Sequence, residues 1–167
     1  MAGVALPGRL ARPARGAAAP GRSRQGVLAA AALSLGAAWV HLAYTSSHWR
    51  DWWGYGLFFL AVGVYQGLFA AVLVRRPATP GLLAGIAGNL GVVLMYVLSR
   101  MRGVPAGPQA GVVERAGTID LATTAGEILL VALLLALLGA TARRRIANAM
   151  LVTGAALWAL RVTGTMP

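Results

Sequence analysis

The amino-acid sequence predicts an all-α integral membrane protein, one bundle of five transmembrane helices with its N-terminus in the cytoplasm and its C-terminus outside. The composition is 58% hydrophobic and only 11% charged, whereas a soluble domain carries charge on about a quarter of its residues. Five apolar stretches also follow one another, each near the roughly 20 residues with which a helix crosses a bilayer. The predicted spans are 27–44, 55–74, 81–98, 121–140 and 146–162, within a single domain of residues 26–167.

Residues 1–25 precede the first apolar stretch and are rich in Arg, Pro, Gly and Ala, without acidic residues. A segment of this composition buries too little apolar surface to fold, so we expect a disordered basic tail in the cytoplasm. A cleaved signal peptide is the alternative interpretation of the next segment, with a small-residue cleavage site at 36–38. The apolar run continues to Tyr44, which is long for a signal peptide and favours a retained helix.

The placement of the arginines predicts the orientation, because cytoplasmic loops of membrane proteins are enriched in positive charge. An N-terminus inside places ten arginines on the cytoplasmic side and five on the outer side. The triplet between the last two spans is the strongest single indication. The cytoplasmic arginines are Arg9, Arg12, Arg15, Arg22, Arg24, Arg75, Arg76, Arg143, Arg144 and Arg145, and the outer ones are Arg50, Arg100, Arg102, Arg115 and Arg161.

All 15 basic residues are arginine, and the formal net charge is +11. These charges are spread over the termini and short loops instead of forming one stripe, so nucleic-acid binding is not expected. Contact of the cytoplasmic arginines with anionic lipids explains them better. Arginine without lysine, together with abundant Ala and Gly, suggests a high-GC bacterial genome, and we predict a location in the bacterial cytoplasmic (inner) membrane. The absence of cysteine excludes disulfides and thiolate metal sites.

The chain has only two histidines and four carboxylates, and the predicted spans place all six at or near the outer side of the membrane. Ionisable groups near hydrocarbon are costly and usually have a function or a partner. His41 is expected about one turn below the outer surface, and Glu127 about 10 Å below it, on the same helix face as Asp120. The candidate ligand-binding or metal-binding residues are His41, His48, Asp51, Asp120 and Glu127, with Gln66, Asn89 and Thr124 as supporting polar residues.

Three interpretations of His41 and Glu127 stay open. They could form a structural pair that joins two helices, because buried polar groups usually find such partners. They could join His48 and a further carboxylate around a divalent metal, since imidazole and carboxylate suit Zn, Mn, Fe or Cu(II). They could also form a proton-linked or small-molecule site, because histidine titrates near neutral pH. No close His-x-x-His or HExxH spacing selects the metal.

The sequence Thr45-Ser46-Ser47 is expected to interrupt the first helix and to leave His48 in a loop. That placement disfavours a haem held by both histidines. The tryptophan-rich run His48-Trp49-Arg50-Asp51-Trp52-Trp53 could form a short interfacial helix that caps the bundle. No set of catalytic residues stands out, and the sequence leaves open whether the protein is an enzyme.

The predicted loop from Ser99 to Ile119 is longer than a usual connection, and such loops tend to be lids, binding loops or disordered segments. Its prolines and glycines favour defined turns. We expect an ordered cap over the outer end of the bundle, with Arg100 or Arg102 next to a carboxylate; a plain solvated loop is the alternative. The residues that define this cap are Arg100, Arg102, Gly103, Pro105, Gly107, Pro108 and Glu114.

Several of these residues together resemble a family of small, uncharacterised multi-pass membrane proteins of high-GC bacteria. The similarity covers His41 to Glu127 and includes Gly54-Tyr55-Gly56, Gln66, Gly88-Asn89, the cap residues and Asp120-Leu121-x-x-Thr124-x-x-Glu127. Met101 departs from the small polar residue expected after the arginine. The family has no assigned activity, so the resemblance implies a fold and a set of residues but no reaction.

We therefore predict a multi-pass membrane protein whose polar cluster faces the extracytoplasmic side and binds a metal ion or a small polar ligand. One alternative is a structural or accessory subunit of a membrane complex with a purely structural His41–Glu127 pair. Another is a small proton-coupled transporter. The expected partners are the lipid bilayer, anionic lipids at the cytoplasmic arginines and other membrane proteins, and a divalent metal is the one candidate cofactor.

Overall fold

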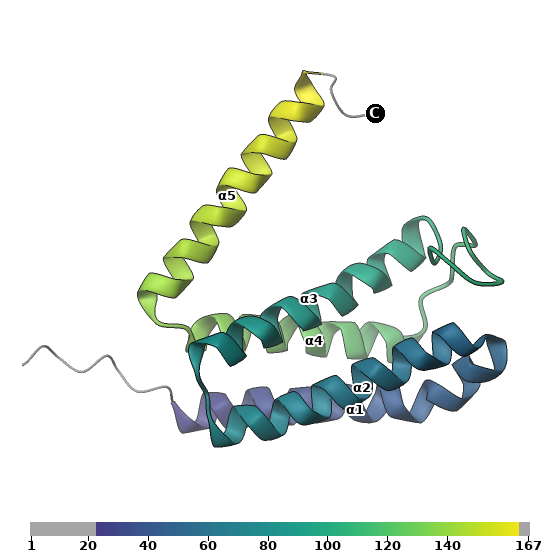
Figure 1. Ribbon diagram of the computed structural model, residues 1–167, viewed down its shortest axis with the longest axis horizontal. Helices are drawn as coiled ribbons and strands as arrows, with labels where there is room; N and C mark the ends of the chain where they lie inside the picture. Colours follow the sequence, from purple (N-terminus) through teal and green to yellow (C-terminus); the bar gives the residue numbers. More distant parts are fainter. Residues whose placement is uncertain (1–22, 164–167) are drawn as a thin grey trace, which may run out of the picture.

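The computed structural model describes residues 23–163, and this part of the chain is all-helical (Figure 1). The predicted disordered tail lies almost entirely outside the described residues. The helices are α1 (Arg24–Asp51), α2 (Trp53–Arg75), α3 (Thr79–Met101), α4 (Thr118–Leu137) and α5 (Ala140–Val162).

Helices α1 to α4 run alongside one another, and each is antiparallel to the next along the chain (Figure 1). The pairs α1–α2, α1–α4 and α3–α4 pack together, whereas α2 and α3 touch only sparsely. These four helices are long and apolar enough to cross a membrane, since 20 to 28 residues extend over about 30–42 Å. The prediction of an all-helical bundle is confirmed, and four of its helices have the length and apolar character of the predicted spans.

Helix α5 leaves the end of α4 at a steep angle and stands apart from the other four helices (Figure 1). Among the described side chains of α5, those of its first turns, Ala142 and Ile146, pack against the bundle core. It is not among the helices long and apolar enough to cross a membrane within the described residues. It begins at Ala140 instead of 146, because α4 ends three residues early at Leu137 and Leu138 has an extended backbone.

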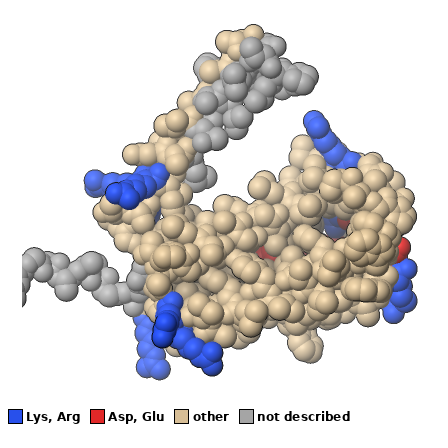
Figure 2. Space-filling model, viewed as in Figure 1, with Lys and Arg blue, Asp and Glu red and all other residues tan. Residues whose placement is uncertain are grey.

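The outer surface of the bundle is apolar, as expected of a protein surrounded by lipid. Large side chains point outward from every helix of the bundle, with Trp39 of α1 75% exposed, Leu68 of α2 64% and Leu94 of α3 65% exposed. A soluble monomer rarely exposes contiguous apolar surface on this scale. Figure 2 shows arginines gathered at the ends of the molecule and an almost uncharged middle.

Helix α1 continues without a break through Thr45, Ser46 and Ser47 to Asp51, so the predicted interruption is wrong. The hydroxyl of Thr45 donates to the carbonyl of His41 over 2.9 Å, and that of Ser47 donates to the carbonyl of Tyr44 over 2.8 Å. Hydroxyls that bond back to the preceding turn remain compatible with a helix. His48 therefore lies in α1, and the loop placement that argued against a two-histidine site is also wrong.

A single residue, Trp52, connects α1 to α2, and its extended backbone reverses the chain. This replaces the expected interfacial helix. The reversal brings the two helices close enough that a Cβ at Gly56 would lie 2.7 Å from the Cα of Trp49. Two turns further along α2, a Cβ at Gly63 would lie 2.7 Å from the side chain of Leu42. Small residues of α2 therefore let α1 and α2 pack tightly within one chain.

The half of the bundle that holds the N-terminal end of α1 is filled with apolar side chains and is closed. Its core joins all four helices and extends to the residue after α4. The core residues are Val27, Ala30, Ala31, Phe69, Ala70, Leu73, Leu82, Ile86, Leu130, Val131, Leu134 and Leu138. The opposite half is built differently.

Candidate functional site

A cavity of about 550 Å³ occupies the half of the bundle that carries the loop between α3 and α4. All four bundle helices and this loop line it. Its volume is within the range of small-molecule sites. No residue of the apolar core lines the cavity, so it ends inside the bundle and does not run through it.

Both histidines and all four carboxylates of the whole chain line this one cavity. Two arginines, Arg100 and Arg115, line it as well. The acidic atoms visible in Figure 2 accordingly lie between the middle of the bundle and the end with the loop. The six ionisable residues are His41, His48, Asp51, Glu114, Asp120 and Glu127. The predicted gathering of these residues at one end of the bundle is thus present in the structure.

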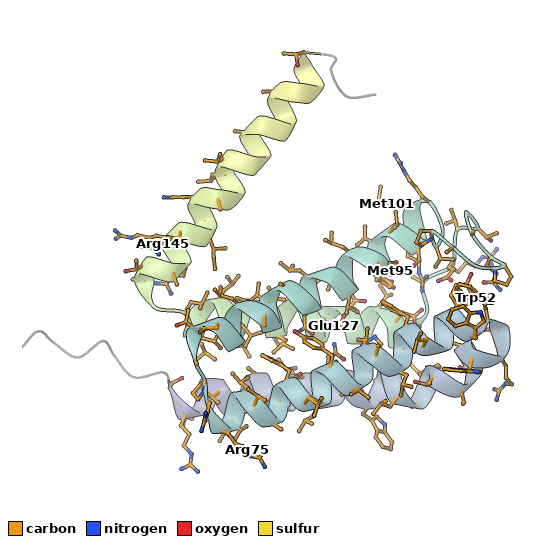
Figure 3. The ribbon with its side chains drawn as sticks, viewed as in Figure 1. Trp52, Arg75, Met95, Met101, Glu127 and Arg145 are labelled. Carbon is orange, nitrogen blue, oxygen red and sulfur yellow. The ribbon has the colours of Figure 1, made fainter. Side chains whose placement is uncertain are left out.

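Glu127 lies on α4 in the middle of the bundle and is only 2% exposed (Figure 3). Its Oε1 accepts a hydrogen bond of 2.8 Å from Nε2 of Gln66 on α2. The same amide nitrogen donates to Oδ1 of Asn89 on α3 over 3.0 Å. Asn89 in turn donates to the carbonyl of Gly85 over 2.8 Å. The amide of Gln66 therefore joins three helices through one nitrogen.

The fourth helix joins this layer through Ser34, whose hydroxyl donates to the backbone carbonyl of Gln66 over 2.8 Å. Ser34, Gln66 and Asn89 are fully buried. We call Ser34, Gln66, Asn89 and Glu127 the polar layer. It lies between the apolar core and the cavity, and Glu127 is its member that lines the cavity. Asn89 and Gln66 were predicted as supporting residues, whereas the role of Ser34 was not foreseen.

Glu127 has one carboxylate oxygen engaged and one available. The bond from Gln66 reaches Oε1, and Oε2 has no hydrogen bond within the described chain and is not sealed among other atoms. Gln66 Oε1, in contrast, is buried without a hydrogen-bond partner among the described residues. The available oxygen of Glu127 thus faces a cavity that can hold a donor.

The imidazole of His41 lines the cavity on the α1 side and is almost fully buried. Its Nδ1 lies 2.9 Å from the carbonyl of Ala37, and because a carbonyl only accepts, Nδ1 carries a proton. His41 lies beside the side chain of Gln66, and no hydrogen bond joins it to Glu127 in the described part of the chain. Of the three interpretations, the direct His41–Glu127 pair is therefore not what the structure shows, because Gln66 is the hydrogen-bond partner of Glu127.

His48 lies two turns further along the same face of α1, with Nδ1 2.9 Å from the carbonyl of Tyr44. Phe59 of α2 packs between the two histidines. Its ring stacks on His48 at 3.7 Å between centroids and is tilted against His41 at 5.4 Å. Each histidine is therefore held by a backbone carbonyl and by the same aromatic ring.

Among residues 23–163, no three side chains of His, Asp or Glu come together in a group able to hold a metal ion. The candidates line one cavity but are distributed over its floor, wall and rim. A metal would need ligands at about 2 Å from a common point. The arrangement of the described residues thus gives the divalent-metal interpretation no support.

The loop between α3 and α4, residues 102–117, is an ordered cap, as one of the two sequence interpretations expected. Arg100 at the end of α3 holds it, pairing through Nη1 with Glu114 and through Nη2 with Asp120 at 2.8 Å. Within the cap, the amide of Gly111 donates to the carbonyl of Val104 over 3.0 Å. Arg102 is exposed and has no ion pair among the described residues, so Arg100 is the arginine that meets the carboxylates.

The cap is fastened to α2 by Tyr55. Its hydroxyl donates to the carbonyl of Ala106 over 3.0 Å and accepts from the amide of Gln109 over 3.2 Å. Gly107 has a positive φ of 96°, and a Cβ there would lie 2.6 Å from the Tyr55 oxygen. Gly103 also has a positive φ, and Pro105 lines the cavity. Pro108 belongs to the same turn, but no contact of its own singles it out.

Aromatic and apolar side chains form most of the cavity wall, and the sequence analysis did not identify them as site residues. Met95 of α3 lies between α2 and α3, and Trp52 lies beneath the cap (Figure 3). A helical period could have found some of them, because Phe59 precedes Gln66 by seven residues and Tyr96 follows Asn89 by seven. The aromatic residues of the wall are Tyr44, Trp52, Tyr55, Phe58, Phe59 and Tyr96.

Of the remaining predicted residues, Thr124 and Asp51 both line the cavity. Thr124 lies one turn above Glu127 on α4, and Asp51 is exposed at the rim. Asp120 shares its helix face with Glu127, as the seven-residue spacing predicted, and both line the cavity. Comparisons of the chain with protein-family models, curated proteins and solved structures find no match. The family resemblance stays a prediction.

Proposed function

We propose that this multi-pass membrane protein binds a small polar ligand in the cavity beneath its cap. The observation that carries the proposal is the recruitment of every carboxylate and both histidines to one cavity that ends within the bundle. Burial of Glu127 costs free energy unless its charge has a partner or a function. A protein that needed only a closed bundle could fill this half with apolar side chains, as it does the other half.

The proposal includes the bacterial cytoplasmic membrane, an N-terminus inside and a cavity that opens to the extracytoplasmic side. Support comes from the end of the bundle opposite the cap, which holds Arg24, Arg75 and Arg76 without any acidic residue. Figure 3 shows Arg75 at this end and Arg145 at the start of α5. Cytoplasmic loops favour such charges. We propose α5 as a fifth span that begins on the same side.

A structural or accessory subunit of a membrane complex is the second candidate. One observation favours it: α5 stands apart from the bundle and exposes Leu151 and Val152, which are 71% and 69% exposed. Such a helix can pack against a partner. A proton-coupled transporter is less well supported, because a transported molecule would have to cross the closed apolar core.

The test of ligand binding is native mass spectrometry of the full-length protein extracted with its surrounding lipids. Thr124→Trp fills the cavity from α4, and Leu121→Trp on the same helix places an equal side chain on the 54% exposed outer face. We expect a small-molecule adduct on wild type and on Leu121→Trp that is absent from Thr124→Trp. Identical spectra for the three proteins, each carrying lipid alone, would contradict the proposal.

A further inference from the structure

We infer that the ligand is an organic cation, an ammonium group attached to an apolar body, with the ammonium next to Glu127 and the body against the aromatic wall. This inference rests on the proposed function and assigns the chemical class of the ligand. Three features carry it: the charge balance of the cavity, the open oxygen of Glu127 and the composition of the wall.

Carboxylates outnumber arginines in the lining of the cavity. Four carboxylates and two arginines line it. Arg100 already pairs with Glu114 and with Asp120. Glu127 and Asp51 have no ion pair among the described residues, so the carboxylates at the floor and at the rim both lack a cation.

The floor of the cavity offers an acceptor. Glu127 lines the cavity, and its Oε2 has no hydrogen bond within the described chain. The Gln66 amide hydrogens are used by Glu127 and Asn89. An ammonium group supplies donors and a positive charge, whereas a carboxylate or phosphate would meet like charge there.

The wall suits the rest of such a ligand. Phe59 lies close to the floor, between the histidines, and Tyr96 lines the α3 side. Tyr96 already receives a cation on its face, since the Arg100 guanidinium lies 4.7 Å from the ring centroid. Aromatic faces attract ammonium groups, most strongly where water is excluded. Val92 and Met95 add apolar surface for the body of the ligand.

An anionic ligand is the main competitor and would need a free arginine. Arg100 is neutralised by its two carboxylates. Arg115 lines the cavity from the cap, and it lies at the end of the cavity away from Glu127. An anion at Arg115 would thus leave the acidic floor unused.

The experiment compares three probes of similar size, 2-phenylethylammonium, 2-phenylethanol and phenylacetate. Binding to the full-length protein is measured by equilibrium dialysis in phosphatidylcholine nanodiscs, with empty nanodiscs as the blank. We expect the ammonium to bind at least about tenfold more tightly than the alcohol, which corresponds to about 1.4 kcal/mol. Phenylacetate is expected to bind most weakly.

Two variants locate the site. Glu127→Gln keeps the shape of the side chain and should weaken ammonium binding at least about tenfold, as for loss of a charged hydrogen bond, while leaving the alcohol unchanged. Phe59→Leu should weaken ammonium binding about fivefold, because it removes aromatic surface against which the body of the ligand packs. Phe69→Leu, the same change on the same helix but in the apolar core, should leave binding unchanged.

Each other outcome overturns the inference in a recognisable way. If the alcohol or phenylacetate binds as well as the ammonium and Thr124→Trp abolishes that binding, the cavity binds ligands but is not selective for cations. An ammonium preference that survives Glu127→Gln contradicts the assignment of Glu127. No binding of any probe contradicts the organic-cation class, and native mass spectrometry then decides separately whether the cavity holds another ligand.

Discussion

Gln66 Nε2 on α2 lies 2.8 Å from Glu127 Oε1 on α4 and donates a hydrogen bond across the middle of the bundle. This contact lies between the two differently built halves of the four-helix bundle. Toward the N-terminal end of α1, the four helices close around an apolar core. Toward the cap, the helices and the cap surround a cavity that Glu127 lines.

Gln66→Leu removes the donor shared by Glu127 and Asn89 and should destabilise the bundle. Interhelical hydrogen bonds of this kind contribute about 1–2 kcal/mol, and two acceptors lose their partner. We expect a lower unfolding midpoint in detergent, measured by circular dichroism. Leu68→Ala, on the same helix and 64% exposed, is the control and should change the midpoint little. An unchanged midpoint for Gln66→Leu would show that the polar layer does not stabilise the fold.

Arg100→Gln should release the cap, because both of its ion pairs join the cap and α4 to α3. A loss of about 1–2 kcal/mol in local stability makes hydrogen exchange about five- to thirtyfold faster. The measurement is hydrogen–deuterium exchange of residues 103–117. Arg102→Gln is the matched control, since Arg102 is exposed and without an ion pair in the described chain. Equal exchange in the two variants would contradict the role assigned to Arg100.

Gly107→Ala should displace the cap from α2, because the new Cβ would lie 2.6 Å from the Tyr55 oxygen at a positive φ. Gly111→Ala is the control. It also has a positive φ, but a Cβ there meets no atom within 4 Å, so it carries only the backbone cost of about 1–2 kcal/mol. Tyr55→Phe should reproduce part of the Gly107→Ala effect on hydrogen exchange of 103–117. Equal effects of the two alanine variants would mean that the Tyr55 contact is unimportant.

The fifth span can be tested by cysteine labelling, since the chain has no cysteine of its own. Val112→Cys in the cap and Ala78→Cys in the turn between α2 and α3 report opposite sides of the membrane. If α5 crosses, Thr163→Cys should react with an impermeant maleimide in intact cells as Val112→Cys does. Labelling that follows Ala78→Cys instead would leave α5 on the cytoplasmic side.

Hydropathy was sufficient to predict four helices and the end at which the ionisable residues gather. It could not predict that α1 continues through Thr45-Ser46-Ser47. Serine and threonine have low helix propensity, but here the hydroxyls of Thr45 and Ser47 donate to carbonyls of the preceding turn. Because α1 continues, His48 lies on the same helix face as His41 and not in a loop.

The sequence predicted which residues belong to the site but not which of them bond to one another. The seven-residue spacing of Asp120 and Glu127 indicated a shared face, which is a property of one helix. The partner of Glu127 depends on which helices are neighbours and at what height, and periodicity contains no such information. Only the structure therefore shows that Gln66 is the hydrogen-bond partner of Glu127. It also shows that Arg100 pairs with both Glu114 and Asp120.

The most direct test of a cavity that is open above the polar layer and closed below it is cysteine reactivity along α4. Thr124→Cys lines the cavity, and Leu134→Cys lies fully buried in the core. In nanodiscs, Thr124→Cys should react with the cationic reagent trimethylammonium-ethyl methanethiosulfonate. It should react more slowly with the anionic reagent sulfonatoethyl methanethiosulfonate. Leu134→Cys should react with neither. Equal protection of both cysteines, or faster reaction of Thr124→Cys with the anion, would contradict a cation-binding cavity above Glu127.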